Sequence, residues 1–175
     1  MHSVLPTSCR GLRSLLHRSE PQTAPVDLSA TIRQVVGLLS SDAMMRNIAV
    51  TRDTGTLPVI VIGDRVQLQQ LILNLIVNAF EAIADGRERL VCVRCHGDHT
   101  RAIVSVRDTG AGLADGTEQR VFEPFFTTKT EGIGMGLSIA RSIVEAHGGS
   151  IRARTIPDGG ATVEFELPVS ETALA

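Results

Sequence analysis

Two glycine clusters enclose a long irregular segment, and together they constrain the fold and the ligand of this chain more than any other feature. The first cluster lies in VRDTGAGL and the second in GIGMGLS, with VFEPFFTTK between them. Glycine permits positive φ and a close approach of the backbone to a ligand. A helix that begins at the second cluster would direct its free N–H groups towards phosphate. The pattern predicts a site for a phosphorylated nucleotide, and we expect ATP.

Length and charge limit the class of protein further. The 175 residues, of which 43% are hydrophobic, can form one well-buried domain. The net charge is −2 with both signs interspersed, which argues against a nucleic-acid surface and a basic membrane anchor. Apolar runs such as residues 57–62 are far shorter than the roughly 20 residues of a membrane-spanning helix. The first twenty residues also lack the apolar core of a signal peptide. We therefore expect a cytoplasmic segment without direct membrane contact, whether or not the full-length protein is membrane-attached.

The three cysteines are Cys9, Cys92 and Cys95, an odd number that does not suggest a disulfide scaffold. Cys92, Cys95 and His96 have the spacing of a c-type haem attachment site. The surrounding alternation LVCVRCHGD predicts a strand, however, and residues three apart in a strand point to opposite faces. We therefore expect reduced cysteines in a strand.

Apolar periodicity predicts alternating helices and strands after an N-terminal boundary at Pro21 and Pro25. Asp27 and Asp64 are expected to cap the first two helices, and His147 to end the third. Residues 109–133 have no sustained period and are interpreted as a mobile lid. The expected helices cover residues 28–45, 64–85 and 134–146, and the expected strands cover residues 48–52, 58–62, 89–96, 101–107, 150–155 and 161–167.

The expected helix at residues 64–85 carries a polar stripe with an unusual composition. Steps of 100° place six polar residues within about 40° of one line, while the other positions are apolar and suited to packing on a sheet. Asn74 and Asn78 lie one turn apart, so both amide oxygens can converge on a hard cation such as Mg²⁺. Taken alone, the helix is also compatible with an ordinary amphipathic role. The stripe comprises Gln67, Gln70, Asn74, Asn78, Glu81 and Asp85.

Four motifs in order resemble those of sensor histidine kinases. QQLILNLIVNAFEAI resembles the N box, VRDTGAGL the G1 box, VFEPFFTTK the F box and GIGMGLS the G2 box, and the resemblance covers residues 26–168. It implies the α/β fold shared with gyrase, Hsp90 and MutL. That fold is a two-layer sandwich of the Bergerat type, in which three helices cover one face of a mixed sheet. The predicted elements fit this architecture.

The resemblance also implies roles for individual residues. Asn78 would bind Mg²⁺ with Asn74 alongside it, and Asp108 would accept the adenine amino group. A carboxylate can accept from the adenine amine but would oppose the O6 acceptor of guanine. The alternative for Asp108 is a turn-forming aspartate before Thr-Gly. Gly110 and Gly112 would let the chain pass close to adenine.

Further residues are implied at the phosphate end of the nucleotide. Lys129 could reach the γ-phosphate, although it and Arg120 could equally face solvent. Phe122 is expected to anchor the lid in the core, while Phe125 and Phe126 would also dock the lid against a partner helix. The remaining implied nucleotide-binding residues are Glu81, Phe126, Thr127, Thr128, Gly132, Gly134, Gly136, Leu137 and Ser138.

The implied chemistry is phosphoryl transfer. In the related ATPases the water-activating glutamate falls at the position of Asn74, and an amide cannot act as a general base, so fast hydrolysis is not expected. Transfer of the γ-phosphoryl group to a histidine fits instead. No phosphoacceptor motif is found, and GLRSLLHRSEP resembles the end of a dimerisation hairpin. We therefore expect a hairpin remnant and linker at residues 1–25, an ATP-binding catalytic domain at residues 26–170 and a tail at residues 171–175.

Such a domain would be a protein histidine kinase that is inactive alone. Its expected partners are a histidine-bearing dimerisation domain, on the same or another chain, and a response regulator receiver domain. One alternative is a serine kinase of the anti-sigma-factor type, against which the complete F box argues. The other is an ATP-gated interaction module like those of gyrase and MutL, against which Asn74 and the short lid argue.

Overall fold

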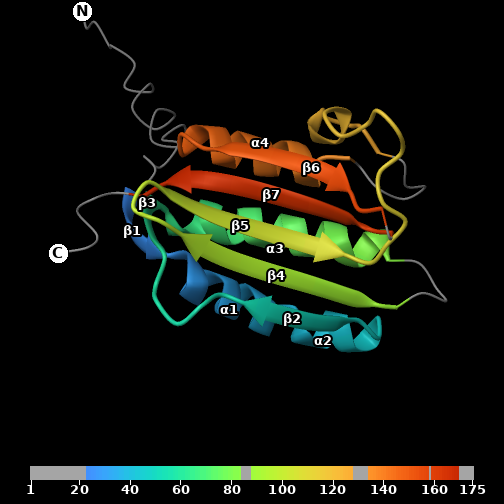
Figure 1. The fold of residues 1–175 in the computed structure, drawn as a ribbon, viewed down its shortest axis with the longest axis horizontal. Helices are drawn as coiled ribbons and strands as arrows, with labels where there is room; N and C mark the ends of the chain where they lie inside the picture. Colours follow the sequence, from blue (N-terminus) through green and yellow to red (C-terminus); the bar gives the residue numbers. More distant parts are fainter. Residues whose placement is uncertain (1–22, 84–87, 128–133, 158, 170–175) are drawn as a thin grey trace, which may run out of the picture.

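The computed structural model describes residues 23–83, 88–127, 134–157 and 159–169. Twelve elements follow one another in these ranges (Figure 1). The strands are β1 Thr23–Asp27, β2 Ala49–Asp53, β3 Ile60–Asp64, β4 Leu90–Gly97, β5 Arg101–Asp108, β6 Ser150–Thr155 and β7 Ala161–Pro168. The helices are α1 Leu28–Leu38, α2 Ser40–Met45, α3 Arg65–Ala82, the short 3₁₀ helix η1 Arg120–Phe122, and α4 Gly136–Ala146.

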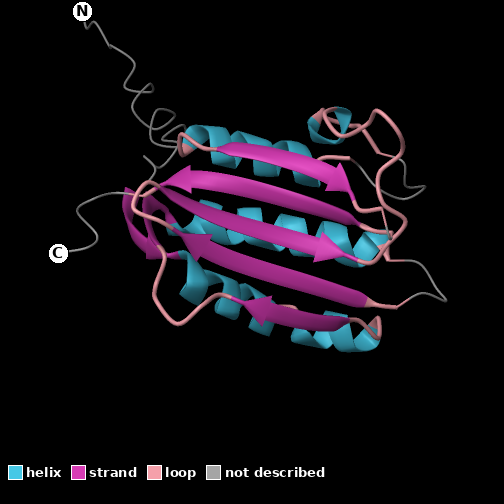
Figure 2. Ribbon diagram, in the orientation of Figure 1, coloured by secondary structure: helices cyan, strands magenta, loops and turns pink. Residues whose placement is uncertain are grey.

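The elements form two layers. A five-stranded mixed sheet has the order β2-β4-β5-β7-β6, in which β2 runs parallel to β4 and the other neighbours are antiparallel. The helices α1, α3 and α4 lie on one face of this sheet, and no helix of the described residues lies over the other face (Figure 2). The strands β1 and β3 form a separate antiparallel pair at one end. This arrangement confirms the predicted two-layer sandwich with three helices on one face.

The helix α3 supplies the centre of the core. Its N-cap Asp64 accepts hydrogen bonds from the backbone N–H groups of Val66 at 2.8 Å and Gln67 at 3.1 Å, as predicted. One side of the helix is fully apolar and packs against the valine-rich inner face of β4 and β5. The buried residues of α3 are Leu68, Leu71, Ile72, Leu75, Ile76, Ala79 and Phe80.

Two features differ from the sequence prediction. The single helix expected at residues 28–45 is divided at Leu39 into α1 and α2. The Ser40 hydroxyl there donates to the Gly37 carbonyl at 2.8 Å, and this competition with the helical ladder, beside a glycine, accounts for the break. The strand β1 was not predicted because Pro25 was interpreted as a breaker, whereas a proline is tolerated in an edge strand such as this one.

The two described cysteines lie on opposite faces of β4, as predicted. Cys95 is buried against the helices, and burial raises the pKa of its thiol to about 11. Cys92 is half-buried on the other face. One ligand therefore cannot be held by both. Within the described ranges, no helix is long and apolar enough to cross a membrane.

The side chain of His147 joins the end of α4 to the start of α3. Its Nε2 accepts a hydrogen bond from the Asp64 backbone N–H at 3.1 Å, and its Nδ1 donates to the Ile143 carbonyl at 2.7 Å. The imidazole lies so close to Gly63 that an added Cβ there would be 2.6 Å from Cδ2 of His147. His147 is the C-cap residue of α4, as predicted, and it also fixes this helix relative to α3.

We predict that His147→Ala destabilises the domain by about 1–3 kcal/mol, because it removes the side-chain acceptor of the Asp64 N–H and the side-chain donor to the Ile143 carbonyl. Urea unfolding followed by circular dichroism measures the change. His96→Ala, at an exposed strand position, is the matched control and should change stability by less than about 0.5 kcal/mol. Equal effects of the two substitutions would contradict the bridging role.

Candidate nucleotide site

The site residues gather where β5 ends. The strand β5, whose last residue is Asp108, ends beside the end of α3 (Figure 1). The Ala111 N–H donates to the Ala82 carbonyl at 3.3 Å, which ties the segment after Asp108 to α3. The predicted adenine and phosphate residues are therefore carried by neighbouring elements.

Asp108 is a buried carboxylate held by the backbone. Only 4% of the residue is exposed. Its Oδ1 accepts hydrogen bonds from the N–H of Gly110 at 2.8 Å and from the N–H of Ala161 at 3.3 Å. These two donors come from different parts of the chain, so the carboxylate orientation is fixed by the fold.

The glycines around Asp108 are required by close backbone contacts. A Cβ on Gly110 would clash with the Ala82 carbonyl. Gly112 has φ of +80°, and a Cβ there would be 3.0 Å from the Thr155 side chain. Gly160 has φ of +89° and leaves no room for a Cβ beside the Asp108 carbonyl. The predicted glycines thus have a structural reason in addition to any ligand.

Sequence analysis missed the contribution of the β6–β7 turn. Gly160 and Ala161 were interpreted only as parts of a hairpin. Gly160 in fact packs against the Asp108 carbonyl, and the Ala161 N–H donates to the Asp108 carboxylate. The signal that was available is the Gly159-Gly160 pair, since both residues have positive φ and two adjacent glycines often mark a tight approach.

The described part of the segment after Asp108 contacts both the core and Gly134. Phe122 is 5% exposed and anchors the segment in the core, as predicted. The Arg120 guanidinium lies 4.8 Å from the centre of the half-buried Phe126 ring. Phe125 is 70% exposed with φ of +65°, and its N–H donates to the Gly134 carbonyl at 3.1 Å. Thr127 is exposed, and the predicted residues Thr128, Lys129 and Gly132 lie outside the described ranges.

A hydrogen bond joins the polar stripe of α3 to the start of α4. The Asn74 side-chain N–H donates to the Gly136 carbonyl at 3.3 Å. Asn78 lies one turn further along α3 and is half-buried, while Glu81 is exposed. Asn74, one of the two residues predicted to lie near the metal, therefore contacts the G2 motif at Gly136.

The first residue of α4 is not crowded by the described residues. A Cβ added to Gly136 would meet none of their atoms within 4 Å. Leu137 packs against the core, and the Ser138 hydroxyl donates to the Met135 carbonyl at 2.9 Å. Among the described residues, no group of three or more His, Cys, Asp or Glu side chains could hold a metal ion. Asn74 and Asn78 do not belong to these residue types, so this finding does not concern them.

Comparison with known proteins identifies the class. A family model described as "Histidine kinase-, DNA gyrase B-, and HSP90-like ATPase" matches residues 63–171. Because the match covers more than half of the chain, this protein belongs to that family of ATPases.

Relatives narrow the class to sensor histidine kinases. The sensor protein FixL of Bradyrhizobium diazoefficiens is 39% identical over 163 residues, which are 93% of this chain and 32% of FixL. The catalytic domain of the histidine kinase ThkA, in a nucleotide-free form, is 32% identical with a TM-score of 0.77, and the match covers 86% of this chain and 98% of that domain. ThkA in complex with the response regulator TrrA has a TM-score of 0.73 at 28% identity, over 92% of this chain and 47% of ThkA.

These similarities confirm the predicted class. The chain corresponds to the catalytic, ATP-binding domain of two-component sensor histidine kinases. It spans about a third or less of the length of the curated relatives that it matches.

We predict that Gly110→Ala destabilises the domain by about 1–3 kcal/mol, because the new methyl group must displace Ala82 or the end of β5. Chemical unfolding measures the loss. Gly37→Ala is the matched control, since a Cβ at this exposed helical position meets no atom within 4 Å, and it should stabilise the domain by up to about 1 kcal/mol. Wild-type stability in Gly110→Ala would contradict the tight junction.

Proposed function

We propose that this domain binds ATP with Asp108 selecting adenine, and that it positions the nucleotide for phosphoryl transfer to a histidine outside residues 1–175. The buried Asp108 carboxylate, oriented by two backbone N–H donors, is the observation that carries the proposal. A fixed acceptor suits the exocyclic amine of adenine and opposes the O6 of guanine. Gly110 and Gly112 line the approach to this carboxylate.

The phosphate end would lie at the α3–α4 junction. Among the described residues, none gives Gly136 a steric reason to be a glycine, whereas an approaching phosphate would give one. With Gly134, Leu137 and Ser138, this residue would form the phosphate-side loop. Thr127, Thr128, Lys129 and Gly132 would approach from the lid.

The two asparagines of α3 fit a magnesium ion that accompanies the nucleotide. The nitrogen of the Asn74 amide is engaged by the Gly136 carbonyl, so its oxygen is the atom suited to a cation. Asn78 follows one turn later as the main ligand, with Glu81 further along the same stripe. Magnesium prefers such oxygen ligands, and when bound it neutralises phosphate charge. Neither asparagine can deprotonate water, which favours transfer over hydrolysis.

The acceptor and the next partner would come from other domains. Phe125 is held in a strained, exposed conformation that a free loop would not favour, and we propose that it docks on a helix of the histidine-bearing dimerisation domain. Because ThkA forms a complex with a response regulator, we propose a receiver domain as the next partner. These reactions would place the domain in the cytoplasm.

We predict that Asp108→Asn lowers ADP and ATP affinity by at least about tenfold, because the amide presents a donor where the adenine amine requires an acceptor. Calorimetry with and without Mg²⁺ measures the change, and GTP should not bind the wild type. Asp115→Asn, an exposed aspartate in the following loop, makes the same charge change and should leave the affinity unaltered. Unchanged ATP affinity in Asp108→Asn, or equal affinity for GTP, would contradict the proposal.

A further inference from the structure

The face of the five-stranded sheet without helices carries side chains in regular rows. Strand pairing aligns Cys92 with Arg107, Arg107 with Thr162, and Thr162 with Arg154. This row runs from β4 to β6. Its β5 member, Arg107, directly precedes Asp108, and successive residues of a strand point to opposite faces. The row therefore crosses the sheet on the face opposite to the proposed adenine site. The next row runs from Arg94 and Ser105 to Glu164 and Arg152, which pair with each other.

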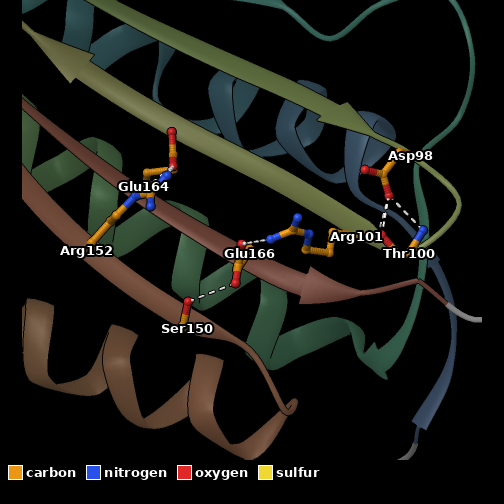
Figure 3. Close-up of polar contacts among 7 residues, drawn as sticks. All are labelled: Asp98, Thr100, Arg101, Ser150, Arg152, Glu164 and Glu166. Carbon is orange, nitrogen blue, oxygen red and sulfur yellow. Dashed lines mark hydrogen bonds and ion pairs between the residues drawn. The ribbon is translucent and has the colours of Figure 1, made fainter.

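Most arginines on this face have carboxylate partners. Arg152 pairs with Glu164, and Arg101 pairs with Glu166, which also accepts from Ser150 (Figure 3). Arg94 lies 4.0 Å from Asp53. Within the described ranges, Arg107 and Arg154 form no ion pair.

A cavity of about 290 Å³ opens over the row that contains these two arginines. Arg94, Arg107 and Arg154 line it together with the hydroxyl-bearing Ser105 and Thr162, and its described lining contains no aspartate or glutamate. Ile156 and Pro157 form an apolar wall. The volume is just below the usual range of about 300–1,000 Å³ for ligand pockets, which suits a compact ligand.

The spacing of the arginines suits one tetrahedral anion. Arg107 and Arg154 stand two strand spacings apart, about 10 Å between Cα atoms, on either side of Thr162. Arg94 is diagonal to Arg107 at about 7–8 Å. Guanidinium side chains are long enough to converge over Thr162, which is itself only 5% exposed. Their mutual repulsion is relieved when an anion accepts from them.

We propose that this cavity is a second anion site, which binds a phosphate dianion either free or as the head of a small phosphomonoester. It is separate from the nucleotide site, because Arg107 and Thr162 face the cavity while Asp108 and the Ala161 N–H face the helix side. The Thr155 hydroxyl, at the rim, accepts from the Leu113 N–H at 3.1 Å, so the cavity borders the segment that follows Asp108.

The test is a titration of the domain with inorganic phosphate and with phenyl phosphate at constant ionic strength, using sodium chloride as the reference. Backbone NMR shifts should move around Thr162 and Arg154 with millimolar or tighter affinity. The double variant Arg107→Gln/Arg154→Gln should weaken binding by at least about tenfold. Tighter binding of phenyl phosphate would identify a phosphomonoester as the ligand through the Ile156–Pro157 wall, and equal binding would identify free phosphate.

Two controls separate this site from other sources of phosphate binding. Arg152→Gln removes a paired arginine from the same face and should change the affinity by less than about twofold. Phosphate-induced shifts confined to Gly136 and Leu137 would place the anion at the nucleotide site and overturn this proposal, so the two proposals fail separately. Phosphate should also slow alkylation of Cys92, which lines the cavity. Unaltered binding in the double variant, or no binding to the wild type, would overturn the proposal.

Discussion

The close meeting of three backbone segments at the end of β5 is the constraint on which the site depends. The end of α3, residues 108–112 and the β6–β7 turn approach so closely that Gly110 and Gly160 cannot carry side chains. The same approach brings the N–H groups of Gly110 and Ala161 onto one oxygen of Asp108. The close backbone packing at Gly110 and Gly160 and the orientation of the Asp108 carboxylate therefore have the same cause. The backbone orients this carboxylate without a ligand.

The helix α3 combines structural and binding roles on opposite sides. Its six buried leucine, isoleucine and phenylalanine side chains each contribute about 1.5–3 kcal/mol by burial, so their packing determines where the helix lies. The amide stripe contributes little to that packing. Asn74 and Asn78 are consequently positioned by the core rather than by each other, and the hydrogen bond from Asn74 to Gly136 relates them to the start of α4. The bridge from His147 to Asp64 fixes the other end of the same helix pair.

Sequence reasoning predicted the features that depend on local pattern. The α3 helix and its Asp64 cap, the two hairpins, the burial of Phe122 and the capping position of His147 follow from periodicity and residue type. It missed β1, because the sequence around a proline does not show whether that proline ends a strand or lies in an edge strand. It also missed the donation from Ala161 to Asp108, since this contact joins residues 53 positions apart. The positive φ of Phe125 is set by its bond to Gly134 and has no local signal.

The most direct test of the central claim is a ¹⁵N NMR titration of the domain with ADP and Mg²⁺, read residue by residue. If Asp108 receives adenine, the largest shifts should include the Gly110 and Ala161 amides, which donate to its carboxylate, together with residues at the start of α4 such as Gly136. Shifts confined to other surfaces, with the Gly110 and Ala161 signals unmoved at saturation, would contradict the account.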